Sequence, residues 1–164
     1  MIRAAHLDEL DALHGIVRAA TRHMDEQGIP QWDEIYPNRQ ILLKDVVQQE
    51  LHVIEVEDQV TGLVVINNDQ SPEYETVQWM YPGRVLVVHR LTIHPAYQRK
   101  GLATRLMDFV EDTAVAHSYD CIRLDAFTRN PAAFTLYENR RYRKAGSVRF
   151  RKGEFYCYEK AMKA

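Results

Sequence analysis

The residues with the clearest chemical potential form a short basic loop in the middle of the chain. An apolar, β-branched run at residues 85–94 predicts a strand, and Pro95 ends it. Arg99, Lys100 and Gly101 then precede an amphipathic segment that predicts a helix. Backbone N–H groups and a helix N-terminus would meet there, and a glycine lets an anion approach the backbone, so the loop suits a pyrophosphate group. An ordinary strand–turn–helix corner with solvated basic residues explains the same spacing equally well.

A second segment, about 30 residues later, joins a strand to a helix. Asn130 is a good N-cap, and Pro131 suits the first helical position. One face of this helix then carries a small residue, Ala133, where a ligand could approach closely, and a phenol, Tyr137, one turn further on. The alternative is that the Tyr137 ring anchors the helix in the core, which is the commoner place for a helical tyrosine.

The elements that must position these segments follow from the hydrophobic periodicity. Helices are predicted at residues 7–24, from Asn38 onward, at 101–117 and at 130–139, strands at 2–5, 51–57, 60–67, 85–94, 121–127, 142–150 and 154–161, and a long loop at 68–83. This order predicts an α/β fold in a single domain of residues 1–164. We expect a mixed, mostly antiparallel (α+β) sheet of about six to seven strands with helices on both faces.

The composition of the 164 residues, with 46% hydrophobic and 27% charged, is ordinary for a globular domain. No apolar run approaches the roughly 20 residues of a membrane span, and the N-terminus has no signal-peptide core, so we expect a cytoplasmic protein. Cys121 and Cys157 lie in strand patterns without a CxxC motif, and the histidines lack metal-ligand spacing. Buried thiols and no metal site are therefore expected.

Taken together, the two segments resemble those of the GNAT superfamily of N-acetyltransferases. Gln98–Ala103 matches that family's pyrophosphate loop, Q/R-x-x-G-x-G/A, Leu91–Pro95 matches the strand before it, and Asn130–Glu138 matches the second CoA segment. The resemblance implies a GNAT-like fold with acetyl-CoA as co-substrate and no metal. The residues that it assigns to CoA binding are Leu91, Thr92, Ile93, Gln98, Arg99, Lys100, Gly101, Leu102, Ala103, Thr104, Asn130, Ala133 and Phe134.

Two positions depart from the family pattern. Arg141 stands where the family usually has a glycine after the second helix, so either Arg141 adopts a costly left-handed conformation or the helix ends at Asn139. The strand at residues 85–94 lacks the glutamate that serves some members as general base. His89 is the titratable candidate on that strand.

The resemblance also implies a mechanism, the direct transfer of acetyl from acetyl-CoA to a primary amine in a ternary complex. Backbone groups around residues 91–93 would bind the pantetheine arm, and one N–H would polarise the thioester carbonyl. Tyr137 would protonate the leaving thiolate. His89 shares strand parity with Leu91 and Ile93 and is the candidate base, acting through a water; the alternative is a structural histidine.

The acceptor site of this family is usually built from the N-terminal helices and the loop before the long strand. Those regions contain Trp32, Glu34, Tyr36 and Trp79, and aromatic rings beside carboxylates suit a cationic amine. Packing of Trp32 and Tyr36 between two helices explains them equally well. Residues 1–75 hold 15 Asp/Glu and 5 Lys/Arg, whereas residues 76–164 hold 8 and 16. We therefore expect CoA on the basic half and an acceptor with additional positive charge, such as a polyamine or a basic peptide end, on the acidic half.

Two other functions stay open. A CoA-binding sensor or scaffold without transfer activity would keep Gly101 and Asn130 but would not need Tyr137. A nucleic-acid-binding module could use the seven basic residues within 140–152, which are interleaved with Tyr142 and Phe150, although the acidic first half argues against it. The expected partners are acetyl-CoA and an amine, with no membrane; a homodimer is left open.

Overall fold

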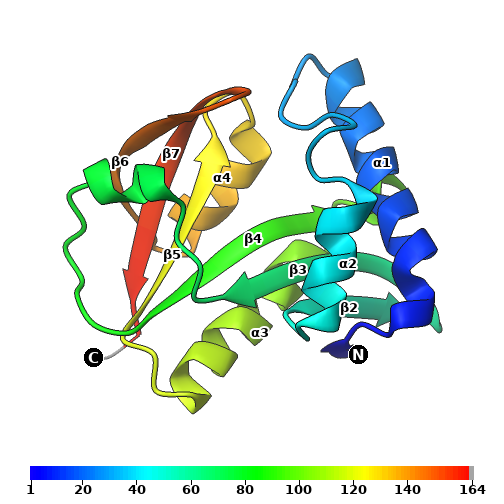
Figure 1. Ribbon diagram of the computed structural model, residues 1–164, viewed down its shortest axis with the longest axis horizontal. Coiled ribbons are helices and arrows are strands. Elements are labelled where there is room, and N and C mark those ends of the chain that lie inside the picture. Colours follow the sequence, from blue (N-terminus) through cyan, green and yellow to red (C-terminus); the bar gives the residue numbers. More distant parts are fainter. Residues whose placement is uncertain (163–164) are drawn as a thin grey trace. The chain divides into compact units, whose positions relative to one another are not determined.

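The computed structural model describes residues 1–162, which form seven strands and four α-helices together with short 3-10 turns (Figure 1). The α-helices are α1 (Leu10–Glu26), α2 (Arg39–Val47), α3 (Leu102–Ala116) and α4 (Pro131–Asn139). The strands are β1 (Ile2–Ala4), β2 (Leu51–Val56), β3 (Gln59–Asn67), β4 (Val85–Ile93), β5 (Cys121–Phe127), β6 (Arg143–Phe150) and β7 (Gly153–Ala161). Within the described residues, every helix is too short or too polar to span a bilayer.

The strands follow the order β1-β2-β3-β4-β5-β7-β6 in one sheet. The β4–β5 pair is parallel, whereas β1–β2, β2–β3, β5–β7 and β6–β7 are antiparallel. The predicted mixed, mostly antiparallel sheet is therefore confirmed. The chain divides into two compact units, and β4 and α3 each contribute to both: unit 1 holds Met1–Ile66 with His89–Phe109, and unit 2 holds Asn67–Val88 with the described residues from Val110 onward.

The core of unit 1 lies where α1 and α2 pack on β2 and β3. The inward face of α1 presents Leu10, Leu13, Ile16 and Val17, which confirms the helical spacing read from the sequence. The helix begins later than predicted, because Leu7 lies in a 3-10 turn and is exposed. Asn38 caps α2 as expected, since its side chain accepts a hydrogen bond from Ile41 N at 2.9 Å.

Unit 2 is built on the hairpin β6–β7 beside β5. Phe150 pairs with Gly153 across the turn, which confirms the hairpin predicted around Arg151 and Lys152. The predicted loop at 68–83 is not wholly irregular, because Pro72–Thr76 forms a 3-10 helix, η2, whose Tyr74 is buried. The buried side chain of Tyr74 therefore anchors this segment in the core of unit 2.

Candidate active site

The predicted pyrophosphate loop in unit 1 is fastened to the end of β4. The side chain of Gln98 donates from Nε2 to the carbonyl oxygen of Ile93 at 3.0 Å. His94 Nδ1 accepts from Ala96 N at 3.0 Å, which closes the 3-10 turn η3 (Pro95–Tyr97). Gln98 therefore sets the loop's position through its own amide, in addition to any contact with a ligand.

The loop has the backbone conformation that an anion site needs. Arg99 and Gly101 both have left-handed φ values, 64° and 78°. A side chain added at Gly101 would meet no atom within 4 Å, so the space in front of this backbone is open. The first hydrogen bond of α3 runs from Arg105 N to Gly101 O at 3.1 Å, and the amides of residues 102–104 precede it, at the positive end of the helix. The geometry fits a pyrophosphate group.

The strand that leads into this loop is irregular at Arg90. Arg90 has φ 53°, although it lies within β4. A left-handed residue interrupts the regular alternation of side chains, so strand parity alone does not place His89 beside Leu91. His89 and Leu91 are both half-buried, and Ile93 and Thr92 are buried.

The predicted acceptor residues of unit 1 differ in exposure. Trp32 lies in the hydrophobic core with α1 and α2 and is only 8% exposed, so core packing accounts for its ring. Glu34 and Tyr36 are exposed. The Tyr36 hydroxyl accepts a hydrogen bond from Arg90 Nη1 at 2.9 Å, and the guanidinium carbon lies 5.9 Å from the ring centre.

Trp79, the predicted acceptor residue of unit 2, is also engaged within the protein. Its Nε1 donates to the carbonyl of Tyr74 at 2.9 Å, and the guanidinium carbon of Arg123 lies 4.4 Å from the ring centre. Both Trp79 and Tyr36 thus already interact with an arginine of this chain. Each ring therefore already has a cationic neighbour within this chain, which weakens the cation–π argument for an acceptor with additional positive charge.

The second predicted CoA segment forms as expected at its start. Asn130 caps α4 by accepting from Ala133 N at 3.3 Å, and Pro131 is the first helical residue. Phe134 packs edge-on against Tyr156, with ring centres 5.6 Å apart.

At the end of α4, Arg141 stands where the family usually has a glycine, and both alternatives expected from the sequence occur together. The helix ends at Asn139, and Arg141 has φ 68°. Arg141 N donates to Glu138 O, and Tyr142 N donates to Tyr137 O, each at 3.0 Å. This is the hydrogen-bond pattern of a Schellman motif, and the rings of Tyr137 and Tyr142 supply its apolar contact. An arginine here occupies the position that favours glycine.

Tyr137 is buried, 5% exposed, between the rings of Tyr142 and Tyr158. Burial raises its pKa above the ordinary value for tyrosine, and the nearby charge of Asp125 raises it further. The phenol therefore stays protonated throughout the physiological pH range.

Asp125 is the functional candidate that the sequence did not reveal. It lies on β5, and its Oδ2 accepts from the hydroxyl of Tyr74 at 2.6 Å. Burial raises the pKa of this carboxyl to about 6, and the Tyr74 hydrogen bond opposes the rise. A partly buried carboxyl poised near neutral pH, electrostatically coupled to Tyr137, is a signature of acid–base chemistry. An isolated aspartate in an apolar strand was the only signal in the sequence.

Three of the seven basic residues at 140–152 form ion pairs with carboxylates. Arg140 forms an ion pair with Glu111 at 3.0 Å, Arg143 with Glu159 at 2.6 Å, and Lys144 with Glu138 at 3.6 Å. These pairs neutralise part of the charge that a nucleic-acid surface would use, which weighs against that alternative. Cys121 and Cys157 are buried free thiols, and residues 1–162 contain no cluster of side chains suited to a metal ion.

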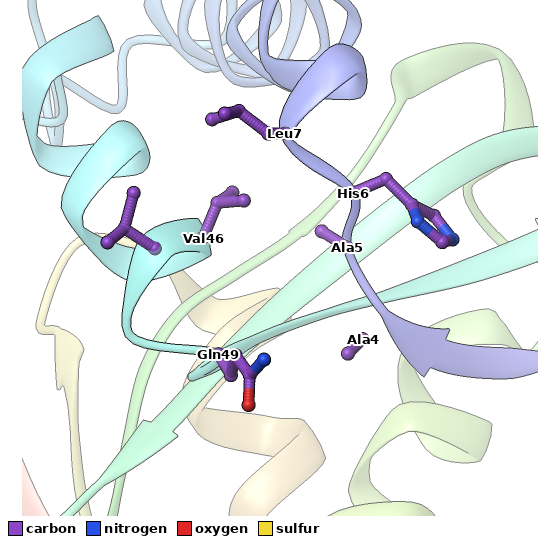
Figure 2. Close-up of a pocket in the computed structure, with 7 residues that line it drawn as sticks. Ala4, Ala5, His6, Leu7, Val46 and Gln49 are labelled. Carbon is purple, nitrogen blue, oxygen red and sulfur yellow. The ribbon is translucent and has the colours of Figure 1, made fainter.

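A shallow cavity of about 390 Å³ lies elsewhere in unit 1, between the β1–α1 connection and the end of α2 (Figure 2). Its lining mixes apolar and polar surface and consists of Ala4, Ala5, His6, Leu7, Val46, Val47 and Gln49. It contains none of the predicted cofactor or acceptor residues.

Comparison with known proteins points to one family. The model of the acetyltransferase (GNAT) family matches residues 16–141, well over half of the chain. A candidate acetyltransferase from Staphylococcus aureus Mu50 is 29% identical, with a TM-score of 0.77 and 99% of each chain covered. A search of curated proteins found no significant match.

Two further structures share the fold at lower identity. A GNAT-family acetyltransferase from Streptococcus agalactiae 2603 has a TM-score of 0.87 at 21% identity, covering 100% of this chain and 96% of its own. The candidate acetyltransferase yncA from Salmonella typhimurium, solved with its cofactor acetyl-CoA, has a TM-score of 0.74 at 17% identity, covering 100% and 94%. The fold of this chain is thus one that holds acetyl-CoA in a relative.

Proposed function

This chain belongs to the acetyltransferase (GNAT) family, and from that premise we propose that it transfers an acetyl group from acetyl-CoA to a primary amine by direct attack in a ternary complex. The observation that carries the proposal is the loop at residues 98–104. Its left-handed Arg99 and Gly101, its open space and the start of α3 together suit the CoA pyrophosphate.

The remaining cofactor contacts follow the family resemblance. Backbone groups at Leu91, Thr92 and Ile93 bind the pantetheine arm, and Asn130, Ala133 and Phe134 contact CoA from the second segment. When bound, acetyl-CoA supplies an activated acyl group. A backbone N–H near Leu91 stabilises the negative charge that develops on the carbonyl oxygen during attack.

We assign proton donation to Tyr137. Its raised pKa keeps the phenol protonated, so a donor is present at every working pH. The same shift makes this phenol a weaker acid than free tyrosine. Proton transfer to sulfur therefore follows cleavage of the carbon–sulfur bond, when the thiolate has its full negative charge.

We assign proton acceptance from the amine to Asp125. With a pKa of about 6, its carboxylate is ionised above neutral pH and accepts a proton more readily than an ordinary aspartate does. The Tyr74 hydroxyl orients the carboxylate through the 2.6 Å hydrogen bond. His89 is the alternative base, and paired variants distinguish the two. The combination of Asp125 and Tyr137 favours catalysis over a CoA sensor, which would need neither group.

The test is an acceptor panel in which CoA release is monitored from acetyl-CoA. The panel holds neutral, zwitterionic and cationic primary amines, because the engaged faces of Tyr36 and Trp79 no longer single out a cation. We expect at least one amine to give turnover well above the rate of acetyl-CoA hydrolysis, and the Tyr137→Phe variant to lose most of it. Tight CoA binding by calorimetry without turnover on any amine would favour the sensor.

A further inference from the structure

Arg90 holds a backbone conformation that side-chain-bearing residues rarely adopt, and it does so in the middle of a strand. Such a conformation persists only where neighbouring groups hold it. The Thr92 hydroxyl donates to the carbonyl oxygen of Arg90 at 2.8 Å. Across the sheet, Gly62 leaves room for β4, since a side chain there would lie 2.8 Å from the carbonyl oxygen of Thr92. These two contacts therefore hold the part of β4 that follows Arg90.

The side chain of Arg90 fixes the irregularity from the other side. Its Nε and Nη2 donate to the two oxygens of Asp45 on α2, at 2.9 and 2.7 Å. Both side chains are nearly buried, 10% and 5% exposed. This is a bidentate pair, in which the planar guanidinium fits the carboxylate in one orientation. Burial raises the pKa of Asp45, and the two Arg90 hydrogen bonds oppose the rise.

The third donor of Arg90 reaches the segment between α1 and α2. Nη1 donates to the Tyr36 hydroxyl at 2.9 Å. Tyr36 belongs to a compact turn in which the Asp33 carboxylate accepts from the amides of Ile35 and Tyr36, each at 3.1 Å, and Asp33 N donates to Tyr36 O at 3.0 Å. One guanidinium thus joins the strand, the helix and this exposed turn.

We propose that Arg90 is a positioning residue that couples the cofactor-binding part of β4 to the turn at residues 33–36. The inference rests on the proposed function, in which β4 binds the pantetheine arm, and on the family resemblance, which places the acceptor beside this turn. A ligand on β4 that favours the left-handed conformation of Arg90 also keeps the Arg90 Nη1 group hydrogen-bonded to the Tyr36 hydroxyl. Such a ligand therefore stabilises the turn at residues 33–36. A ligand ordered on the turn favours the same state of Arg90. Acetyl-CoA and the acceptor then bind cooperatively, because both stabilise one conformation of one residue.

Hydrogen–deuterium exchange with CoA as the probe tests this coupling without knowledge of the acceptor. The signals are the amides of residues 33–36, measured with and without saturating CoA. In the wild type we expect CoA to slow their exchange at least about fivefold, the lower end of ordinary coupling between two sites. The Tyr36→Phe variant removes only the hydroxyl that meets Arg90, and its CoA-dependent slowing should vanish while CoA still binds.

The matched control is Tyr119→Phe, which removes a hydroxyl that donates to Asn68 at 2.8 Å in unit 2 and should leave the slowing unchanged. Arg90→Lys keeps the charge but loses the bidentate fork, and it should abolish the slowing and weaken CoA binding. Slowing that persists in a folded Tyr36→Phe variant overturns the proposal, because direct contact with CoA would then explain it. CoA binding without slowing in the wild type overturns the coupling alone. Absence of CoA binding to the wild type overturns both the coupling and the proposed function.

Discussion

Replacement of Asp125 by asparagine should change the pH dependence of stability and activity together. Asparagine has nearly the same shape, does not titrate, and offers an oxygen to the Tyr74 hydroxyl, which donates to Asp125 at 2.6 Å in the wild type. The variant therefore isolates the charge of the carboxylate from its packing.

The magnitude follows from the raised pKa. Burial raises the pKa of Asp125 from 3.8 to about 6, and each unit corresponds to about 1.4 kcal/mol, so ionisation costs the fold about 3 kcal/mol. The folded state holds this proton more tightly than the unfolded chain does. The stabilising contribution of the protonated form is thus complete below about pH 4 and is lost as the pH rises through about 6. The asparagine variant has no proton to lose at this position, so its stability does not fall in this way as the pH rises.

Urea denaturation at pH 4, 6 and 8 measures the effect. Relative to the wild type, Asp125→Asn should gain up to about 3 kcal/mol in free energy of unfolding between pH 4 and pH 8. The Tyr74→Phe variant is the matched control for the hydrogen bond, which lowers the pKa of Asp125. Without this hydrogen bond the pKa of Asp125 should rise further. The Tyr74→Phe variant should therefore lose its stability contribution from protonated Asp125 at a higher pH than the wild type does. Parallel stability profiles for wild type and Asp125→Asn would refute the burial argument.

The same variant separates the two candidate bases. If Asp125 accepts the amine proton, kcat/KM of the wild type rises with pH through about 6, and Asp125→Asn loses about 100- to 10,000-fold in kcat. His89→Asn should then retain most of the activity. The opposite ranking of the two variants would move the base to His89.

Three further outcomes are expected. Arg141→Gly should raise the free energy of unfolding in urea by about 1 kcal/mol, because Arg141 holds a left-handed φ of 68°; an unchanged or lower value would mean that the arginine side chain compensates for its backbone. Tyr137→Phe should lower kcat by about 10- to 1,000-fold with little change in the acetyl-CoA dissociation constant, and wild-type kcat would place the proton source elsewhere. Gly101→Glu should raise that dissociation constant strongly in calorimetry, since it puts a side chain and a negative charge into the open space of the loop; unchanged affinity in a folded variant would rule out the loop as the pyrophosphate site.

Local features were predictable from the sequence, since they depend on residues a few positions apart. The N-caps Asn38 and Asn130 each bond an amide three residues away, and both were expected from residue type alone. The conflict at Arg141 was visible because a C-terminal cap has a fixed position after its helix. The fold followed from the order of elements, and a glycine between a strand and a helix located the loop that we propose for the pyrophosphate.

Tertiary structure decided the features that join distant parts of the chain. Asp125 was not singled out within the strand predicted at residues 121–127, and only its hydrogen bond with Tyr74, 51 positions earlier, shows how this partly buried carboxyl is held. The irregularity at Arg90 broke the alternation predicted for β4, because Asp45 and Tyr36, 45 and 54 positions earlier, hold its side chain. Hydrophobic periodicity in a sequence assumes a regular backbone. It shows which side chains share one face of a helix or strand, and not which distant residues they contact. Which buried charge meets which partner is fixed by packing between segments, and there a hydrogen bond to a distant residue outweighs the local preference of the backbone.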